Sequence, residues 1–421
     1  MEPEILINSL WVLMAAIVVF FMQAGFALLE AGLCRSKNTV NILMKNSLDF
    51  GIGAISYTLI GFGIMYGASA SGLFGTSNFG NPVKNFEIEG LMPGSFFFFQ
   101  LVFAAATATI VTGAMAERTN FKAYLIYSSV MCLVIYPVSG HWIWGGGWLS
   151  EIGFMDYAGS TAVHSVGGWA ALVGAAIVGP RIGKYVKDPK TGKTKVNSFP
   201  AHNIFLSCLG MFVLWLGWYG FNPGSELAFN ENVLHTVITT TAAVACGSVT
   251  SMITSWARYG KPDLSLVING VLGSLVGITA GCRFVDLWGA MIIGALAGIF
   301  VIFSIEFIDR ILKIDDPVGA STVHGTCGVF GTLMIGLFSS GGENGVHDGA
   351  SGLFYGGGLK LLGIQILGAF AVFVWVVAMA FILFTLLKKF AHLRVSPAEE
   401  LKGLDIEEHG AVSYPEFVLH D

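Results

Sequence analysis

The chain has 421 residues, of which 54% are hydrophobic and only 12% carry a charged side chain, and its formal net charge is −5. Soluble domains carry about 25% charged residues, so the composition excludes an ordinary soluble domain and predicts an integral membrane protein. The net charge itself indicates no class of partner.

Apolar segments long enough to cross a bilayer, about 20 residues each, recur almost from end to end of the chain. The predicted spans are residues 6–30, 41–66, 95–116, 121–138, 160–179, 202–221, 233–257, 264–281, 285–307, 320–338 and 358–387. The predicted fold class is therefore an all-α integral membrane protein with eleven transmembrane helices. Residues 1–390 are expected to form the transmembrane domain and residues 391–421, where the apolar pattern ends, a cytoplasmic tail.

Lysine and arginine are distributed unevenly between the predicted loops. Short cytoplasmic loops retain these cations. With the N-terminus outside, all but three of the 22 lysines and arginines fall on the cytoplasmic side, the exceptions being Lys84, Arg283 and Lys360. We therefore predict an outside N-terminus and a cytoplasmic C-terminus. No cleavable signal is expected, because the first span is too long and acidic residues precede it.

The first two spans contain charged residues near their predicted cytoplasmic ends. Lys45 and Asp49 are four residues apart on one helix, and Glu30 is expected at a similar depth. One interpretation is a structural ion cluster that faces the interior of the bundle. The other is an internal exit for protons, and the sequence leaves both open.

Aromatic residues gather at the predicted outer ends of three spans. FFFFQLVF (96–103) begins the third span, HWIWGGGW (141–148) supplies three tryptophans to an expected outer loop, and GWYGFNPGS (217–225) ends the sixth span. An interfacial aromatic belt would explain most of them. A belt does not require the adjacent glycines and serine, whereas an aromatic face binds a cation with about 0.5–2 kcal/mol.

One motif occurs twice, with an aspartate eight residues before a histidine: Asp156 with His164, and Asp316 with His324. GSTAVH (159–164) and GASTVH (319–324) are both followed by small residues. In the predicted topology the two helices cross the membrane in opposite directions. The repeat is therefore inverted, as in many transporters, with halves at about 6–179 and 202–338 and the eleventh helix outside it.

Each histidine is expected near the middle of the membrane. Eight helical residues rise about 12 Å, against about 15 Å for half of the hydrocarbon core. The two imidazoles can therefore meet. An interhelical hydrogen bond would explain one buried histidine, but two at the same depth favour a transport pathway. Asp316 is predicted to cap its helix, whereas Asp156 is placed either to cap its helix or to favour a cation.

Five segments together resemble ammonium transporters of the Amt/Mep/Rh superfamily, Amt branch: YPVSGHWIWGGG, DYAGSTAVHSVGG, GWYGFNPGS, DDPVGASTVHGTCG and GLDIEEHG. The resemblance covers essentially the whole chain. It implies a gate made by the stacked rings of Phe103 and Phe221, above a narrow apolar pore that contains His164 and His324. It also implies an outer ammonium site formed by Trp144, Phe103 and Ser225. Trp218 is expected near this site, and Asp156 is expected to support it electrostatically.

The free energy of dehydration constrains what such a pore conducts. Moving an ion into a medium of low dielectric constant costs about 20 kcal/mol in the idealised limit, and one cation–π contact returns about 2 kcal/mol. Ammonium differs from potassium because it donates directional hydrogen bonds and can lose a proton. We therefore expect the outer site to deprotonate ammonium, ammonia to cross the pore, and the imidazoles to relay the proton.

The resemblance further implies a homotrimer in the plasma membrane and a PII signalling protein as a regulator at the tail, and it leaves open whether methylammonium is also accepted. No cofactor and no nucleic acid are expected. An ammonium sensor and a neutral ammonia channel remain alternatives. An enzyme is not expected, because two histidines without an HExxH motif or a third ligand form no catalytic metal set. The six cysteines contain no CxxC pair and indicate neither a disulfide framework nor a zinc site.

Overall fold

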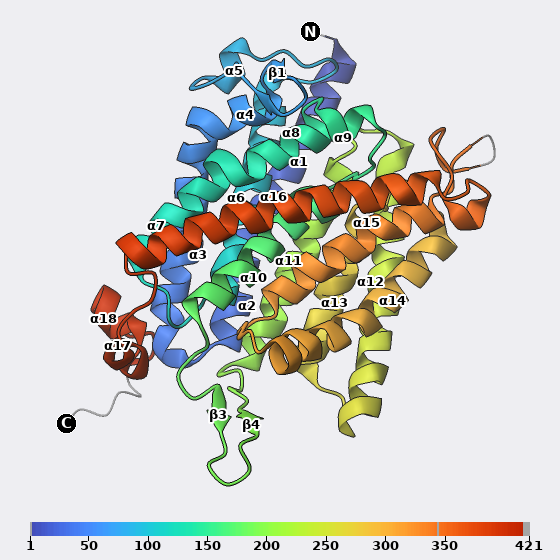
Figure 1. Cartoon of the computed structure of the whole chain (residues 1–421). Helices are drawn as coiled ribbons and strands as arrows, with labels where there is room; N and C mark the ends of the chain where they lie inside the picture. Colours follow the sequence, from blue (N-terminus) through green and yellow to red (C-terminus); the bar gives the residue numbers. More distant parts are fainter. Residues whose placement is uncertain (1, 343–344, 416–421) are drawn as a thin grey trace.

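The computed structural model describes residues 2–342 and 345–415, and within them the chain forms a bundle of long helices (Figure 1). Ten of these described helices are long and apolar enough to cross a membrane, and the apolar helix Leu264–Thr279 adds a shorter one of 16 residues. They correspond in order to the eleven predicted spans. The prediction of an all-α membrane fold is therefore confirmed.

The first half of the bundle supplies five spans, and three of them contain a π-helical segment. The helices are α1 (Pro3–Phe20), α2 (Met22–Leu33), α3 (Thr39–Ser56), η2 (Tyr57–Gly61), α4 (Phe62–Tyr66), α6 (Pro93–Ala114), α7 (Phe121–Val130), η3 (Met131–Ile135), α8 (Tyr136–Trp144), η4 (Ser160–Ser165) and α10 (Val166–Val178). Short elements connect them: η1 (Ser36–Asn38), strands β1 (Ser69–Ala70) and β2 (Phe74–Gly75), α5 (Pro82–Asn85) and α9 (Trp148–Glu151). The two strands pair antiparallel.

The second half supplies five spans and is followed by the long helix α16 (Lys360–Phe390). Its helices are α11 (Ile204–Gly224), α12 (Glu231–Tyr259), α13 (Leu264–Thr279), α14 (Leu287–Glu306), η5 (Phe307–Leu312), η6 (Ser321–Thr326) and α15 (Cys327–Phe338). The antiparallel hairpin β3 (Tyr185–Lys187) and β4 (Thr194–Val196) joins the two halves. The remaining short elements are η7 (Leu353–Tyr355), α17 (Pro397–Lys402) and α18 (Leu404–His409).

Helix α6 lies at the centre of the bundle and α16 lies at its periphery. In the most apolar window of α6, 89% of the residues are buried, against 28% in that of α16. Figure 1 shows α16 running obliquely across the outside of the other helices. Exposed apolar side chains on a peripheral membrane helix face lipid, so α16 forms part of the lipid-facing surface, whereas α6 is enclosed by other helices.

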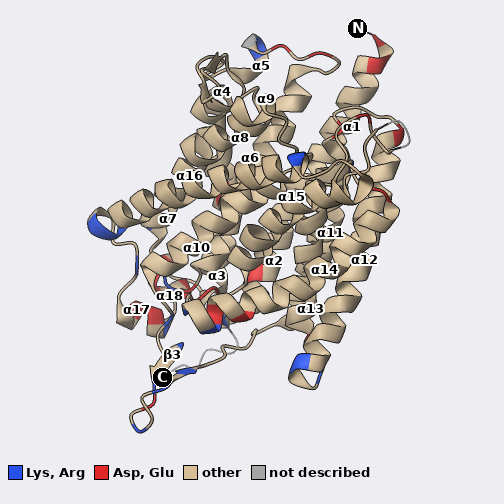
Figure 2. Cartoon of the chain, turned by 45° about the vertical axis from the view of Figure 1, so that its right-hand side comes forward, with Lys and Arg blue, Asp and Glu red and all other residues tan. Residues whose placement is uncertain are grey.

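The bundle has two ends with different charge. The N-terminus, α5 and β1 lie at one end, which we call the N-terminal face, and the hairpin β3–β4 with α17 and α18 lies at the other, which we call the tail face (Figure 1). Most of the lysines and arginines lie toward the tail face (Figure 2). This separation in space matches the uneven loop charge from which the orientation was predicted.

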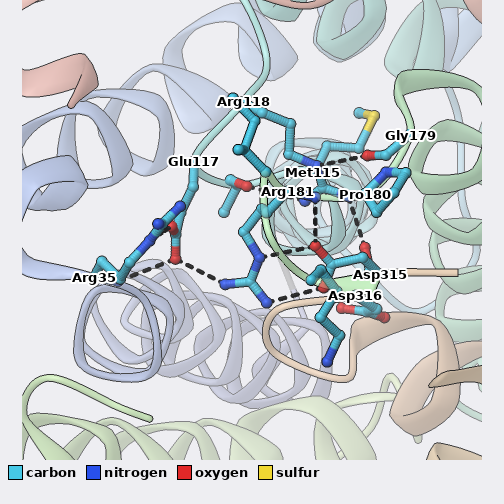
Figure 3. Close-up of polar contacts among 12 residues, drawn as sticks. Arg35, Met115, Glu117, Arg118, Gly179, Pro180, Arg181, Asp315 and Asp316 are labelled. Carbon is cyan, nitrogen blue, oxygen red and sulfur yellow. Dashed lines mark hydrogen bonds and ion pairs between the residues drawn. The ribbon is translucent and has the colours of Figure 1, made fainter. Parts of the chain in front are cut away.

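A buried group of charged residues fastens the loops at the tail face (Figure 3). Arg181 is at its centre, with Nη1 2.9 Å from Glu117 Oε1 and Nε 2.9 Å from Asp315 Oδ2. Arg35 also pairs with Glu117, and Arg118 donates to the carbonyl oxygen of Asp315 at 2.6 Å. Although burial opposes ionisation, the Arg181 guanidinium holds the pKa of the Asp315 carboxyl well below its ordinary value.

Replacing Arg181 with alanine is expected to destabilise the protein by about 3–5 kcal/mol, because Glu117 and Asp315 would remain buried without their shared cation. Thermal unfolding followed by tryptophan fluorescence measures the change. Arg258→Ala is the control, since the Arg258 side chain is half exposed and water screens its pair with Glu306. Equal stability of the two variants would contradict a fastening role for Arg181.

The tail is folded against the tail face up to residue 415. The main-chain N–H of Asn41 donates to Asp405 Oδ1 at 2.9 Å, and that of Ile182 donates to Glu400 Oε1 at 2.7 Å. Lys37 Nζ donates to the carbonyl of Glu400 at 2.7 Å. Within the part described, the tail is therefore an ordered segment on its own chain, and residues 416–421 lie outside the described residues.

Candidate functional site

A pocket of about 300 Å³ opens between α6, α8 and the end of α11 toward the N-terminal face. Phe103, Trp144 and Ser225 all line it. These are the three residues that the family resemblance implies as an ammonium site. They come from segments far apart in the sequence, so the fold brings this predicted set together.

The prediction of an outer loop around Trp144 is wrong in one respect, because most of this segment is helical. Helix α8 continues to Trp144, and α9 starts at Trp148. The predicted fourth span ends at residue 138, six residues before the end of α8. The polar His141 is however buried and fully paired, with Nδ1 2.8 Å from Met65 O and Nε2 2.8 Å from Ser69 Oγ, so the helix tolerates it and only three glycines remain as a loop.

Hydrogen bonds fix the polar atoms of the pocket. Trp144 Nε1 donates to the carbonyl oxygen of Asp156 at 2.7 Å, which anchors the edge of the indole. The Ser225 hydroxyl donates to the carbonyl oxygen of Phe221 at 2.9 Å. Its lone pairs therefore stay available to a hydrogen-bond donor in the pocket.

Two phenyl rings close the bottom of the pocket. Phe103 and Phe221 stack with ring centroids 4.0 Å apart and an interplanar angle of 13°. The His164 ring lies on the other side, 5.2 Å from the Phe221 ring. Trp218 is fully buried and stacks on His164 at 5.2 Å, with its Nε1 bonded to Thr279. It therefore lies behind the phenyl pair and contacts the histidine, outside the lining of the pocket.

The two histidines meet in the interior. His164 and His324 are 1% and 5% exposed, and their Nδ1 atoms are 3.2 Å apart. His164 Nε2 has no hydrogen-bond partner in the part of the chain that the structure describes. The pair is a hydrogen bond in which one Nδ1 carries the proton and the other accepts it. The histidine pair thus continues the line from the pocket through the phenyl rings.

Each histidine lies in a π-helical segment, His164 in η4 and His324 in η6. The premise that eight helical residues lead to each histidine is wrong, because η4 begins only at Ser160, after a turn at Gly159 with φ +112°, and η6 begins only at Ser321. The helices still approach closely. A Cβ on Gly168 would lie 2.0 Å from the nitrogen of Gly325, so the small residues after the histidines permit the contact.

Both aspartates of the repeated motif cap their helices. Asp156 accepts four main-chain N–H groups, from residues 159 to 162, at 2.8–3.0 Å. Asp316 accepts those of Val318, Gly319 and Ser321 and the Ser321 hydroxyl. Burial raises the pKa of the Asp156 carboxyl to about 6, and the four donors limit the rise. The carboxylate is thus occupied by its own helix.

Sequence reasoning missed Gln100, which also lines the pocket. Among the described residues, this buried side chain finds no hydrogen-bond partner for its Oε1. The sequence does contain a signal for this residue. Gln100 is the single amide in FFFFQLVF, and a polar side chain inside a membrane span usually has a functional role. Within the described residues, no group of three His, Cys, Asp or Glu side chains could hold a metal ion.

Comparison with known proteins supplies the family. Residues 10–414 match the model of the Ammonium Transporter Family. The chain is 41% identical over 432 residues to ammonium transporter Amt2 of Archaeoglobus fulgidus, with 99% of this chain and 90% of that protein covered. A solved structure titled "Sensor Amt Protein" is 40% identical and has a TM-score of 0.89. The match covers 96% of this chain and 99% of that one.

More distant structures have the same fold. Candida albicans Mep2 is 28% identical, with a TM-score of 0.86 over 98% of this chain and 91% of that one. The family is one of membrane transporters and not of enzymes. With a family match over nearly the whole chain and a bundle of apolar spanning helices, this multi-pass membrane protein belongs to the ammonium transporter family.

Proposed function

We propose that this chain transports ammonium by separating it into ammonia and a proton, which cross by different routes and recombine on the other side. The observation that carries the proposal is the contact of two buried imidazoles directly behind a stacked pair of phenyl rings. A dehydrated cation is too costly in such surroundings, at several kcal/mol even after relaxation. Neutral ammonia avoids that cost.

Recruitment takes place in the pocket at the N-terminal face. Ammonium gives up water there and gains a cation–π contact with Trp144 and Phe103, worth about 2 kcal/mol at most. Its N–H groups donate to the Ser225 hydroxyl and to Gln100 Oε1, which are acceptors without a competing donor. Potassium offers no N–H groups, so these acceptors favour ammonium.

The imidazole pair then serves two purposes. A neutral imidazole has one donor and one acceptor nitrogen, so the pair offers hydrogen bonds to ammonia without adding charge. The shared Nδ1–Nδ1 bond also lets a proton arriving at one ring leave from the other. Chains of ionisable residues act as proton relays in many transporters.

The orientation, assembly and regulation are part of the same proposal. The positive tail face faces the cytoplasm, since short cytoplasmic loops retain lysine and arginine (Figure 2). Residues 1–390 then form the transport domain and residues 391–421 the regulatory tail. The homotrimer, the PII partner and the attraction of a cation by Asp156 stay predictions.

Electrophysiology on a solid-supported membrane tests the function. Purified protein in liposomes is exposed to equal pulses of ammonium and of potassium. We expect a current with ammonium and none above empty liposomes with potassium. Equal currents with both ions, or none with either, would contradict the proposal.

The same liposomes distinguish the two alternatives. A neutral ammonia channel would change the internal pH, read by an enclosed dye, without current. A sensor would give little of either signal, and it is kept as a second candidate because the structure titled "Sensor Amt Protein" is among the similar ones.

A further inference from the structure

A second, much smaller cavity lies on the tail side of the histidine pair. Its volume is about 10 Å³, which accommodates about one water molecule. Most of its lining is aliphatic, and the polar groups on it are His324, Glu30 and Asn269. The cavity is therefore where a proton or ammonia molecule leaving His324 first meets another ionisable group.

Glu30 reaches this cavity from α2. The ring of Phe26, one helical turn earlier, lies 5.9 Å from the ring of His324, so Glu30 lies one turn nearer the tail face, about 5–6 Å along the helix. Glu30 is only 2% exposed. Its Oε2 accepts a hydrogen bond from Asn46 Nδ2 at 2.9 Å.

The other carboxylate oxygen of Glu30 has no donor among the described residues. A Cβ built on Gly113 would lie 2.9 Å from Oε1 and 2.7 Å from Val318 Cγ2. Oε1 therefore lies against the wall formed by Gly113 and Val318, and Val318 lines the cavity. One oxygen is thus held by the protein, and the other is free to bind a proton.

The neighbouring charges of α3 do not share this position. Lys45 Nζ donates to the carbonyl of Thr119 at 2.9 Å. Asp49 accepts from Thr112 at 3.0 Å and from Ser128 at 2.8 Å. Neither residue lines the cavity, and among the described residues no ion pair joins either of them to Glu30. The structural ion cluster, one of the two interpretations that the sequence leaves open, is thus divided, and of these three residues only Glu30 lines the cavity.

A route leads from Glu30 to the tail face. Asn269 and Val318 line both the small cavity and a larger one of about 440 Å³ that also contacts Asp316, Arg181 and Lys184. Asn269 Oδ1 is buried without a partner. The wide cavity is polar and large enough for many water molecules. Glu30 therefore lies between the histidine pair and this vestibule.

We propose that Glu30 is the proton acceptor at the tail-side exit of the pore, an inference that rests on the proposed function. The proton leaves a ring nitrogen of His324 and binds Glu30 Oε1, which turns the carboxylate into a carboxyl group. An ammonia molecule that has crossed the pore then takes this proton. Ammonium is restored, the carboxylate is regenerated, and one positive charge has crossed per ammonia.

The test is the Glu30→Gln variant in the liposome assay, with current and internal pH recorded together. Glutamine keeps an oxygen to accept from Asn46 but binds no proton at neutral pH. We expect the ammonium current to fall about 100-fold, the scale of losing a positioned proton-transfer group, while ammonia flux persists. Glu30→Asp should restore much of the current. Glu151→Gln, which removes an exposed carboxylate at the N-terminal face, should leave both signals unchanged.

Three outcomes would overturn the role of Glu30. They are an unchanged current in Glu30→Gln, a loss of current and ammonia flux together, and a failure of Glu30→Asp to exceed Glu30→Gln. The second would mean that Glu30 only supports the shape of the pore. The wild-type current separates this inference from the proposed function: if the wild-type protein gives no ammonium current, the function fails, and if only the Glu30 results disagree, the function stands.

Discussion

Replacing either His164 or His324 with asparagine is expected to reduce the ammonium-evoked current about 100-fold, because the relay loses one of its two proton-transfer groups. Asparagine forms hydrogen bonds but does not ionise. The two Nδ1 atoms are 3.2 Å apart, so the proton on one ring has the other ring as its acceptor. The relay therefore depends on both rings. Each single variant should therefore lose as much as the double variant.

The measurement is the same pulse experiment, with potassium pulses to follow selectivity. His235→Asn is the matched control, since His235 is half-buried at the N-terminal side and bonds only to the carbonyl of Val285. We expect the control to keep the wild-type current. Unchanged current and selectivity in both pore variants would remove the relay from the mechanism.

The sequence predicted the fold well because the pattern that encodes it is long and local. A run of about 20 apolar residues has only one stable form in a bilayer, a helix with its hydrogen bonds satisfied internally. Ends of helices were less predictable. The fourth span extends to Trp144 because His141 finds two partners on neighbouring elements, and such partners are distant in sequence.

The contact between the two histidines was predictable for a different reason. His164 and His324 recur in a repeated motif, and symmetry between two halves implies a common depth. Gln100 and Glu30 belong to no repeated motif, since each is a single polar residue in an apolar stretch. The sequence placed Glu30 with Lys45 and Asp49. The surroundings of its side chain depend on α2 packing against α6 and on a cavity that α2 shares with α13, and no local pattern states either.

The Asp156→Asn variant changes a single polar atom of the side chain. Among such variants of the site, we expect it to lower the stability of the protein most. Each carboxylate oxygen of Asp156 accepts two main-chain N–H groups. An asparagine keeps one of these oxygens and turns an NH₂ group toward the other two donors. Two buried N–H groups would lose their acceptor, at about 1–3 kcal/mol each.

Transport should decline with stability, because the carbonyl of Asp156 also anchors the Trp144 indole at 2.7 Å. Thermal unfolding of purified Asp156→Asn measures the first effect and the ammonium current the second. Asp316→Asn is the matched variant from the other half of the repeat. Asp316 is only partly buried, so water can replace its lost bonds and the loss of stability should be smaller, about 1 kcal/mol.

The pair of variants separates the two roles predicted for Asp156. A large loss of stability, exceeding that of Asp316→Asn, means that the carboxylate acts as the cap of η4. Wild-type stability combined with a lost current would contradict the cap and would mean that its charge acts on the cation itself. Since four donors already occupy the two oxygens, we expect the first result: Asp156 serves transport by fixing the helix that holds His164 and the indole that receives ammonium.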